Sequence, residues 1–424
     1  MNCIPKAKMS LVVQCVGELV LKLSARKTAF LMSAAMAIML AACGGGSGGG
    51  NVLPVNNGTP SPPISPPPPP PPVVSAPANS LSEKFHGDFL VGGALNSFQI
   101  DAGDLAVEVA RMQFNTLTPE YQLKADVLAP TEGVYDFTRA DQIVNWALEN
   151  GMEVRGHALV WHEATPAYFY EGTPEEIRAR LEAYVTTVVT HFRGRVKVWD
   201  VVNEATSIDI FAGDNGIGPD RPTDWYEAVG SADYIDWAFR AARAADPDAL
   251  LFLNDYETEN PIKRAWFIEI AQRLIDRGVP IDGVGHQMHL QPNSTAAEVL
   301  AAIDDVDNQF LGLINHITEL DMSAYDNPGE CWVSQTNCEA DFGPVAPPAF
   351  LEAQARLMRD LFNGFADRPS VESVTTWGVL DDDNWLNFTP VERNNFPLLF
   401  DANGNPKPAY QAIIDDDYVI VSGD

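Results

Sequence analysis

From about Leu81 onward the chain alternates between two kinds of apolar segment. Short β-rich runs of nearly continuous apolar residues are each followed by a longer segment whose apolar residues recur at helical spacing. Strands that are apolar along their whole length fit a parallel sheet buried on both faces. Eight such strands alternating with helices predict an α/β fold, the (β/α)8 or TIM barrel. The predicted strands are Leu90–Asn96, Phe114–Pro119, Glu153–Trp161, Val196–Glu204, Leu250–Asp255, Gly283–His289, His316–Asp321 and Val374–Val379.

The segments between these strands are amphipathic and of helical length. A doubly wound open sheet is the alternative fold for such a pattern. No Gly-rich phosphate-binding loop follows the first strand in the way that a nucleotide-binding fold needs, which favours the barrel. The predicted helices include Arg139–Asn150, Glu175–Phe192, Tyr234–Ala245, Lys263–Arg277 and Phe350–Phe365.

Residues 1–42 have the features of a signal peptide. Arg26 and Lys27 precede the apolar run Ala29–Ala42, which is too short to span a bilayer. The run ends in the letters LAAC at Cys43, which resemble a bacterial lipobox, and lipidation of that cysteine would make it the mature N-terminus. A plain signal peptide cleaved near residue 42 is the alternative, and translation that starts later, for example at Met9, stays open.

Residues 43–80 have the composition of a linker. They are Gly/Ser-rich and then Pro-rich, with an unbroken proline run at Pro66–Pro72. Such a segment cannot bury a core and favours a partly stiff tether, with a Pro-rich ligand for a binding module as the alternative. We therefore expect one folded domain, residues 81–424, held outside the cytoplasm on a bacterial outer membrane or cell surface.

The cysteines fit the same location. Cys3 and Cys15 leave with the signal peptide, and Cys43 takes the lipid. Cys331 and Cys338 remain and lie close together in the sequence, so outside the cytoplasm they predict a disulfide that closes a loop.

The charge balance bears on possible partners. The chain has 27 basic and 58 acidic residues, a net charge of −31, which would repel a polyanion such as nucleic acid. We expect no nucleic-acid partner, contact with a membrane only through the lipid, and a monomer.

Polar side chains collect at the carboxyl ends of the predicted strands, which form the active-site face of such a barrel. In the segment KVWDVVNEA a buried strand runs into Asn203 and Glu204. Alone, this pair could simply end the strand, with Asn203 starting a turn and Glu204 facing water. Glu319 is a second carboxylate in an equivalent place. The residues of this set are Glu120, Lys124, His157, Trp161, Asn203, Glu204, Asn254, Tyr256, Gln287, His289, Glu319, Asp321 and Trp377.

Two glutamates on opposite sides of a barrel mouth can flank one bond. Cleavage of a glycosidic bond needs such a pair, one to protonate the leaving oxygen and one to attack or stabilise the anomeric carbon. Aromatic side chains offer flat apolar faces to sugar rings, while amides and imidazoles address hydroxyl groups. The set therefore predicts a carbohydrate site, although His157 alone could be a core histidine and Trp161 or Trp377 could be packing residues.

A metal site is the competing hypothesis. His157 and His289 lie on different strands without a local ligand motif, and strand alternation turns His286 away from His289. We expect neither a metal nor a cofactor.

Seven segments resemble, in this order, the retaining xylanases of glycoside hydrolase family 10: FNTLTPE, RGHALVWH, WDVVNEA, LFLNDYE, PIDGVGHQMH, ITELD and TTWG. The resemblance covers about residues 85–414 and implies a retaining endo-β-1,4-xylanase acting on xylan. It implies that Glu204 is the acid/base and Glu319 the nucleophile, that Asn203 holds the sugar 2-hydroxyl, and that His289 bonds the nucleophile with Asp321 behind it. Matching sugar-subsite positions on the non-reducing side are Glu120, Lys124, His157, Trp161, Gln287, Trp377 and Trp385.

The sequence departs from the family in places. The family motif Glu-Asn-x-x-Lys-Trp reads EYQLKA here, so Tyr121 replaces an amide and Ala125 a tryptophan. This predicts a weaker non-reducing subsite or tolerance of another sugar or branch. The acidic run Asp381–Asp383 and the insert Tyr325–Val345 are further places where the cleft can differ. Two alternatives follow: a related retaining β-glycosidase with shifted specificity, and a polysaccharide-binding lipoprotein without catalysis, against which the two glutamates argue.

Overall fold

The computed structural model describes residues 79–207 and 218–421, all of which belong to one compact unit. The predicted signal peptide, Cys43 and the linker up to residue 78 lie outside these residues. Within the described ranges, no helix combines the length and the apolar character that crossing a membrane requires.

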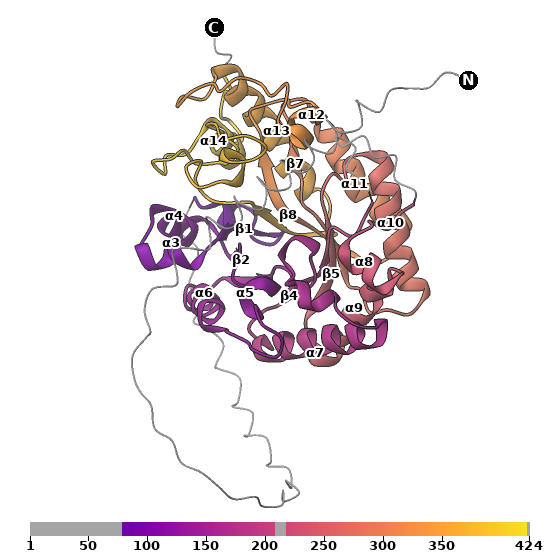
Figure 1. The fold of residues 1–424 in the computed structure, drawn as a ribbon. Helices are drawn as coiled ribbons and strands as arrows, with labels where there is room; N and C mark the ends of the chain where they lie inside the picture. Colours follow the sequence, from indigo (N-terminus) through magenta and orange to yellow (C-terminus); the bar gives the residue numbers. More distant parts are fainter. Residues whose placement is uncertain (1–78, 208–217, 422–424) are drawn as a thin grey trace, which may run out of the picture. The chain divides into compact units, whose positions relative to one another are not determined.

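The strands form a closed parallel barrel surrounded by helices, as the sequence predicts (Figure 1). From β1 to β6 each strand pairs with the next along the chain, β6 pairs with β8, β8 pairs with β9, and β9 pairs back with β1, which closes the ring. The short β7 pairs only with β8. The strands are β1 (Leu90–Leu95), β2 (Thr116–Pro119), β3 (Glu153–Gly156), β4 (Val198–Asn203), β5 (Leu250–Asp255), β6 (Gly283–His286), β7 (His289–Leu290), β8 (Ile314–Met322) and β9 (Val371–Thr376).

Helices follow the strands and bury an apolar face against them. Between β3 and β4, α7 begins with Pro174 after a capping box in which the Thr173 and Glu176 side chains satisfy each other's backbone N–H groups. The α-helices are α2 (Leu81–Lys84), α3 (Ser97–Ala102), α4 (Leu105–Gln113), α5 (Ala125–Leu128), α6 (Thr138–Glu149), α7 (Pro174–Phe192), α8 (Asp224–Val229), α9 (Asp233–Ala245), α10 (Pro261–Asp276), α11 (Ala296–Gln309), α12 (Gly329–Ser334), α13 (Pro348–Ala366) and α14 (Pro408–Ile414). The short 3-10 helices are η1 (His162–Ala164), η2 (Ala167–Tyr170) and η3 (Trp385–Asn387).

The third and sixth predicted strands are interrupted where they approach the site. The third ends at Gly156, and only an isolated bridge from Val160 to Val202 continues it. The sixth stops at His286 and resumes as β7 at His289, because Met288 adopts a left-handed backbone with φ of 58°. Both breaks lie where the barrel opens into the cleft. Hydrogen bonds between strands are lost there, and polar side chains are placed in the cleft instead.

The break after β6 sends its two histidines to different surroundings. Buried His286 contacts the side chains of Thr258 and Asn315, whereas His289 lies in the cleft described below. The prediction that the two point apart is confirmed. Burial lowers the pKa of His286 to about 4, so this histidine is neutral and structural.

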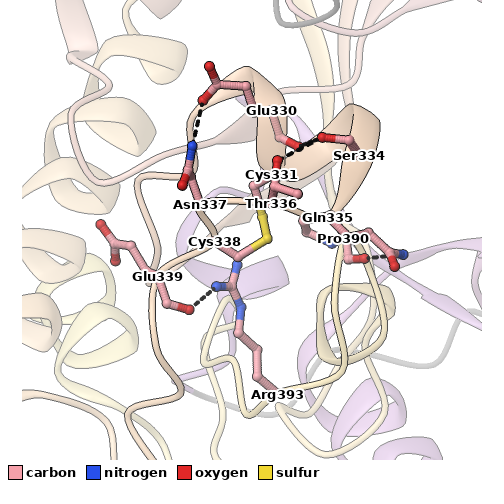
Figure 2. Close-up of a disulfide and its surroundings, with 10 residues drawn as sticks. All are labelled: Glu330, Cys331, Ser334, Gln335, Thr336, Asn337, Cys338, Glu339, Pro390 and Arg393. Atoms are coloured by element: carbon pink, nitrogen blue, oxygen red, sulfur yellow. Dashed lines mark hydrogen bonds between the residues drawn. A yellow bond between two sulfur atoms is a disulfide. The ribbon is translucent and has the colours of Figure 1, made fainter. Parts of the chain in front are cut away.

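The predicted disulfide between Cys331 and Cys338 is present and closes the turn around α12 (Figure 2). This turn belongs to the insert between β8 and α13. The acidic run before Trp385 has a structural part: Asp381 pairs with Lys407 at 2.9 Å, and Asp383 accepts a 2.8 Å hydrogen bond from Gln99.

Candidate active site

A cleft of about 490 Å³ opens at the carboxyl ends of the strands. Every residue of the predicted site lines it except Asn254, which lies buried directly behind. The lining residues are Glu120, Tyr121, Lys124, His157, Trp161, Glu163, Asn203, Glu204, Arg221, Tyr256, Glu257, Gln287, His289, Leu290, Gln291, Glu319, Asp321, Ser323, Trp332, Trp377, Trp385, Leu386 and Thr389.

Glu204 follows the last residue of β4 and has a left-handed backbone with φ of 59°. An ordinary side chain rarely adopts this conformation, and such strain collects at functional sites. Glu204 Oε2 accepts a hydrogen bond from Trp161 Nε1 at 2.9 Å, and Oε1 accepts one from Gln287 Nε2 at 3.1 Å. The carboxylate is thereby fixed in the cleft.

The charge state of Glu204 depends on its neighbours. Burial alone would raise its pKa, but the Arg221 guanidinium outweighs burial, together with His162 and the hydrogen bonds from Trp161 and Gln287. The pKa of Glu204 is therefore lowered, and this carboxyl is ionised in the substrate-free site.

Glu319 lies on β8 and is joined to Glu204 through two amides. Asn254 Nδ2 donates to Glu319 Oε1 at 2.9 Å and to Asn203 Oδ1 at 2.8 Å. Asn203 Nδ2 in turn donates to Glu204 Oε1 at 3.2 Å. Because Asn254 also accepts a 2.8 Å hydrogen bond from Thr318, its orientation is determined on both sides. The carboxylates of β4 and β8 thus belong to one hydrogen-bonded unit.

His289 connects Glu319 to a third carboxylate. Its Nε2 lies 3.3 Å from Glu319 Oε2, and its Nδ1 lies 3.0 Å from Asp321 Oδ2. Burial alone would lower the pKa of His289, but Asp321 and then Glu319 outweigh it and raise this pKa to about 10. A protonated His289 donates a hydrogen bond to each of the two carboxylates.

His157 is held from below by a buried charge pair. Its Nδ1 lies 3.0 Å from Asp200 Oδ2, and Asp200 forms a bidentate pair with Arg155. Burial would raise the pKa of Asp200, but the Arg155 charge outweighs burial and lowers it. The His157 ring lies 5.1 Å from Trp377, ring centre to ring centre, so the barrel interior supports an aromatic part of the cleft wall.

The wall after β2 combines charge and aromatic rings. The Lys124 ammonium lies 4.7 Å from the ring centre of Trp161 and 5.1 Å from that of Tyr121. Burial raises the pKa of Glu120, which accepts a hydrogen bond from Asn96 at 3.3 Å. Of the two departures from the family motif, Tyr121 lines the cleft and is 46% exposed, whereas Ala125 does not line it and is buried at 3%.

Several cleft residues were not predicted from the sequence. Arg221 lies 3.4 Å from Glu204 Oε2 and also contacts His162 Nε2 and the Tyr256 hydroxyl. Arg221 lies far from any strand end, so neither strand position nor helical spacing indicates that it belongs to the site. Trp332 belongs to the insert, where the cysteine pair is the signal that could have drawn attention to it. The acidic run Asp381–Asp383, by contrast, does not line the cleft.

Within residues 79–207 and 218–421, no group of three or more His, Cys, Asp or Glu side chains is arranged to hold a metal ion. The chemistry of the cleft lies in its two linked glutamates, its protonated histidine and its aromatic walls. On a (β/α)8 barrel these features define a glycoside hydrolase.

The chain belongs to glycosyl hydrolase family 10, whose family model matches residues 80–416. It is 41% identical to a β-1,4-xylanase of Dictyoglomus thermophilum over 339 residues, which cover 79% of this chain and 90% of that relative. It is 40% identical to a thermostable celloxylanase of Thermoclostridium stercorarium over 356 residues, 79% of this chain and 87% of the relative. The crystal structure of xylanase B from Clostridium stercorarium F9 matches with a TM-score of 0.71 and 39% identity over 79% of this chain and 99% of the other.

Proposed function

We propose that this chain is a retaining endo-β-1,4-xylanase that hydrolyses internal β-1,4-xylosidic bonds of xylan by double displacement. Family membership and the names of its relatives support this function. The observation that carries it is the link between Glu204 and Glu319 through Asn203 and Asn254, because glycosidic cleavage needs two carboxyl groups acting on one sugar.

In the first step Glu319 attacks the anomeric carbon while Glu204 gives its proton to the departing oxygen. A bond forms between the sugar and the Glu319 carboxylate, and the glycosidic bond breaks. Protonated His289 suits this role for Glu319, since its Nε2–H stabilises the carboxylate before attack. Asn203, bonded to Glu204 and to Asn254, is the residue that we assign to the sugar 2-hydroxyl.

In the second step a water molecule loses its proton to Glu204 and attacks the anomeric carbon, which releases Glu319. Covalent attachment removes the negative charge of Glu319, which lets Glu204 act as the base. The lowered pKa of Glu204 favours this second role. The first step needs the protonated form, so the site as it stands favours chemistry at the acidic side of neutrality.

The test is to replace each glutamate by glutamine and to measure reducing ends released from xylan. We expect Glu204→Gln and Glu319→Gln to lose activity by at least about a thousandfold, and Glu269→Gln, on the exposed side of α10, to keep it. In Glu204→Ala and Glu319→Ala, whose shortened side chains leave room for the anion, azide should restore turnover of an activated aryl xyloside, with a β-glycosyl azide from the Glu204 variant and an α-glycosyl azide from the Glu319 variant. Substantial activity on xylan in either variant would refute the roles, and an inactive wild-type protein would support a binding lipoprotein instead.

A related β-glycosidase with a shifted sugar preference is the second candidate function. Tyr121 in the cleft wall, in place of the family's amide, and the relative named a celloxylanase favour it. Product profiles on xylan, mixed-linkage glucan and aryl cellobiosides separate the two candidates. A kcat/KM higher on glucan than on xylan would favour the second.

We also propose that the enzyme is a lipid-anchored monomer outside the cytoplasm, with residues 1–42 removed and residues 43–80 acting as a tether for the catalytic domain. The support is the LAAC sequence at Cys43 and the composition that follows it. Cys43→Ser should release the enzyme from the membrane fraction. A mature N-terminus elsewhere, or an unmodified Cys43 found by mass spectrometry, would contradict the anchor.

A further inference from the structure

The insert between β8 and α13 brings an aromatic side chain into the cleft. Trp332 lies on α12, lines the cleft, and approaches Trp385 of η3 with ring centres 6.1 Å apart and planes inclined by 37°. At this separation the two rings contact each other directly, so no sugar fits between them. They form one continuous wall.

This wall leads outward from the nucleophile. Glu319 contacts His289, whose ring lies 4.9 Å from the Trp385 ring, centre to centre. Trp385 Nε1 donates to Asp321 Oδ2 at 2.8 Å, which fixes its ring beside the catalytic carboxylates. Trp332 is the next ring beyond Trp385. A sugar ring that packs on Trp332 is therefore farther from the reacting carbon than one that packs on Trp385.

Trp332 is positioned by the turn that carries it. Its Nε1 is buried and has no hydrogen-bond partner in the described part of the chain, so packing alone holds the indole. The preceding residue, Cys331, is bonded to Cys338 (Figure 2). Gln335 Nε2 donates to the Pro390 carbonyl at 2.9 Å and ties the turn to the loop after η3.

We propose that Trp332 extends the aromatic wall of Trp385 and binds a xylose ring of the substrate, and that the Cys331–Cys338 disulfide positions it. A pyranose presents an apolar C–H face that packs well on an indole. This inference rests on the proposed xylanase function, because it assigns a sugar subsite within the same cleft.

The test compares substrates of different length. We expect Trp332→Ala to lower kcat/KM on xylohexaose about tenfold more than on an aryl xyloside, because the short substrate does not reach the outer ring. Trp332→Phe should restore most of the loss, since it keeps an aromatic face. Val333→Ala, a neighbouring change at a side chain that is 62% exposed, is the matched control. Equal losses on both substrates, or no loss on xylohexaose, would overturn the sugar-binding role.

The contribution of the disulfide is measured in the same way. Reduction of the folded enzyme with a phosphine, or the double change Cys331→Ala with Cys338→Ala, should give part of the same length-dependent loss. In an enzyme that already carries Trp332→Ala, loss of the disulfide should lower kcat/KM little further, because both changes act through the Trp332 side chain. Full additivity would contradict positioning by the disulfide. Far-UV circular dichroism of each variant checks that the barrel is folded.

Binding measurements separate this inference from the proposed function. Tryptophan fluorescence of Glu204→Gln titrated with xylohexaose reports binding without turnover. If the wild-type enzyme does not cleave xylan, the proposed function fails, and if xylohexaose then binds with and without Trp332 equally well, the subsite fails as well. If xylan is cleaved but Trp332→Ala binds xylohexaose with unchanged affinity, only the subsite fails.

Discussion

Arg221 Nη1 lies 3.4 Å from Glu204 Oε2, the oxygen that also accepts the hydrogen bond from Trp161. The segment that carries Arg221 runs between β4 and α8, so a loop side chain sets the charge environment of a residue at a strand end. This pair opposes protonation of Glu204, although glycosidic cleavage needs its proton. In the proposed mechanism, the balance between the two steps therefore depends on Arg221.

We predict that Arg221→Met moves the basic limb of the pH profile of kcat/KM on xylan to higher pH. Without the guanidinium the pKa of Glu204 rises, so the acid stays protonated to higher pH. The displacement should be on the order of one pH unit. Arg178→Met removes an equal charge on the exposed side of α7 and should leave the limb in place. A basic limb that stays in place or moves to lower pH in Arg221→Met would contradict this role of Arg221.

We predict that His289→Asn lowers kcat and also removes a pH-dependent part of the stability. The folded pKa of about 10 lies above the unfolded value, about 6.5. The ion pairs of His289 therefore stabilise the fold fully below about pH 6.5, and this stabilisation is lost as the pH rises toward 10. The deficit in melting temperature should be about 5 °C at pH 5.5 and should shrink on the alkaline side.

The control for this prediction is His86→Asn at an exposed position. Melting curves of both variants and the wild type between pH 5.5 and 9.5 are the measurement. A deficit that stays constant over that range would mean that His289 contributes by packing and not by charge.

We predict that Tyr121→Asn raises kcat/KM on linear xylo-oligosaccharides by about threefold to tenfold relative to aryl cellobiosides. Tyr121 lies in the cleft wall and its ring lies 5.1 Å from the Lys124 ammonium. An amide there can address a sugar hydroxyl, and one hydrogen bond to substrate is worth about 0.5–1.5 kcal/mol. Tyr121→Phe keeps the ring without the amide and should not give the gain. A fall in kcat/KM on both substrates with Tyr121→Asn would show that the Tyr121 ring itself binds the sugar.

We predict that Ala125→Trp destabilises the enzyme and does not restore a subsite. Ala125 is 3% exposed at the start of α5 and does not line the cleft. Overpacking of this kind costs about 1–3 kcal/mol. Thermal unfolding followed by circular dichroism checks this, with the exposed neighbour Val127→Trp as the control. An unchanged melting temperature together with tighter xylan binding would refute it.

Sequence patterns predicted the barrel well because apolar strands and amphipathic helices are local signals. The end of β6 was less predictable, since the left-handed residue Met288 is bulky and shows no sequence preference for such a backbone. Near the mouth of the barrel, the contacts of polar side chains decide where a strand ends. These contacts join residues that lie far apart in the sequence, so local sequence patterns do not reveal them.

The site was predictable where function lies at strand ends and unpredictable where it lies in loops. Glu204, Glu319 and His289 follow from strand position together with the family resemblance. Arg221 and Trp332 reach the cleft from long connections whose path depends on tertiary packing. Asn254 was predicted at the rim of the barrel, but the structure places it buried behind the cleft, where it links Glu319 to Glu204 through Asn203.

The fixed orientation of Asn254 rests on a residue without a side chain. A Cβ atom on Gly285 of β6 would lie 2.1 Å from Asn254 Oδ1. A scan of mutational tolerance should therefore score position 285 as intolerant even of alanine, although Gly285 does not line the cleft. Directed evolution of this enzyme would gain by leaving that position out of its libraries, because one methyl group there displaces the amide that bonds Glu319 directly and Glu204 through Asn203.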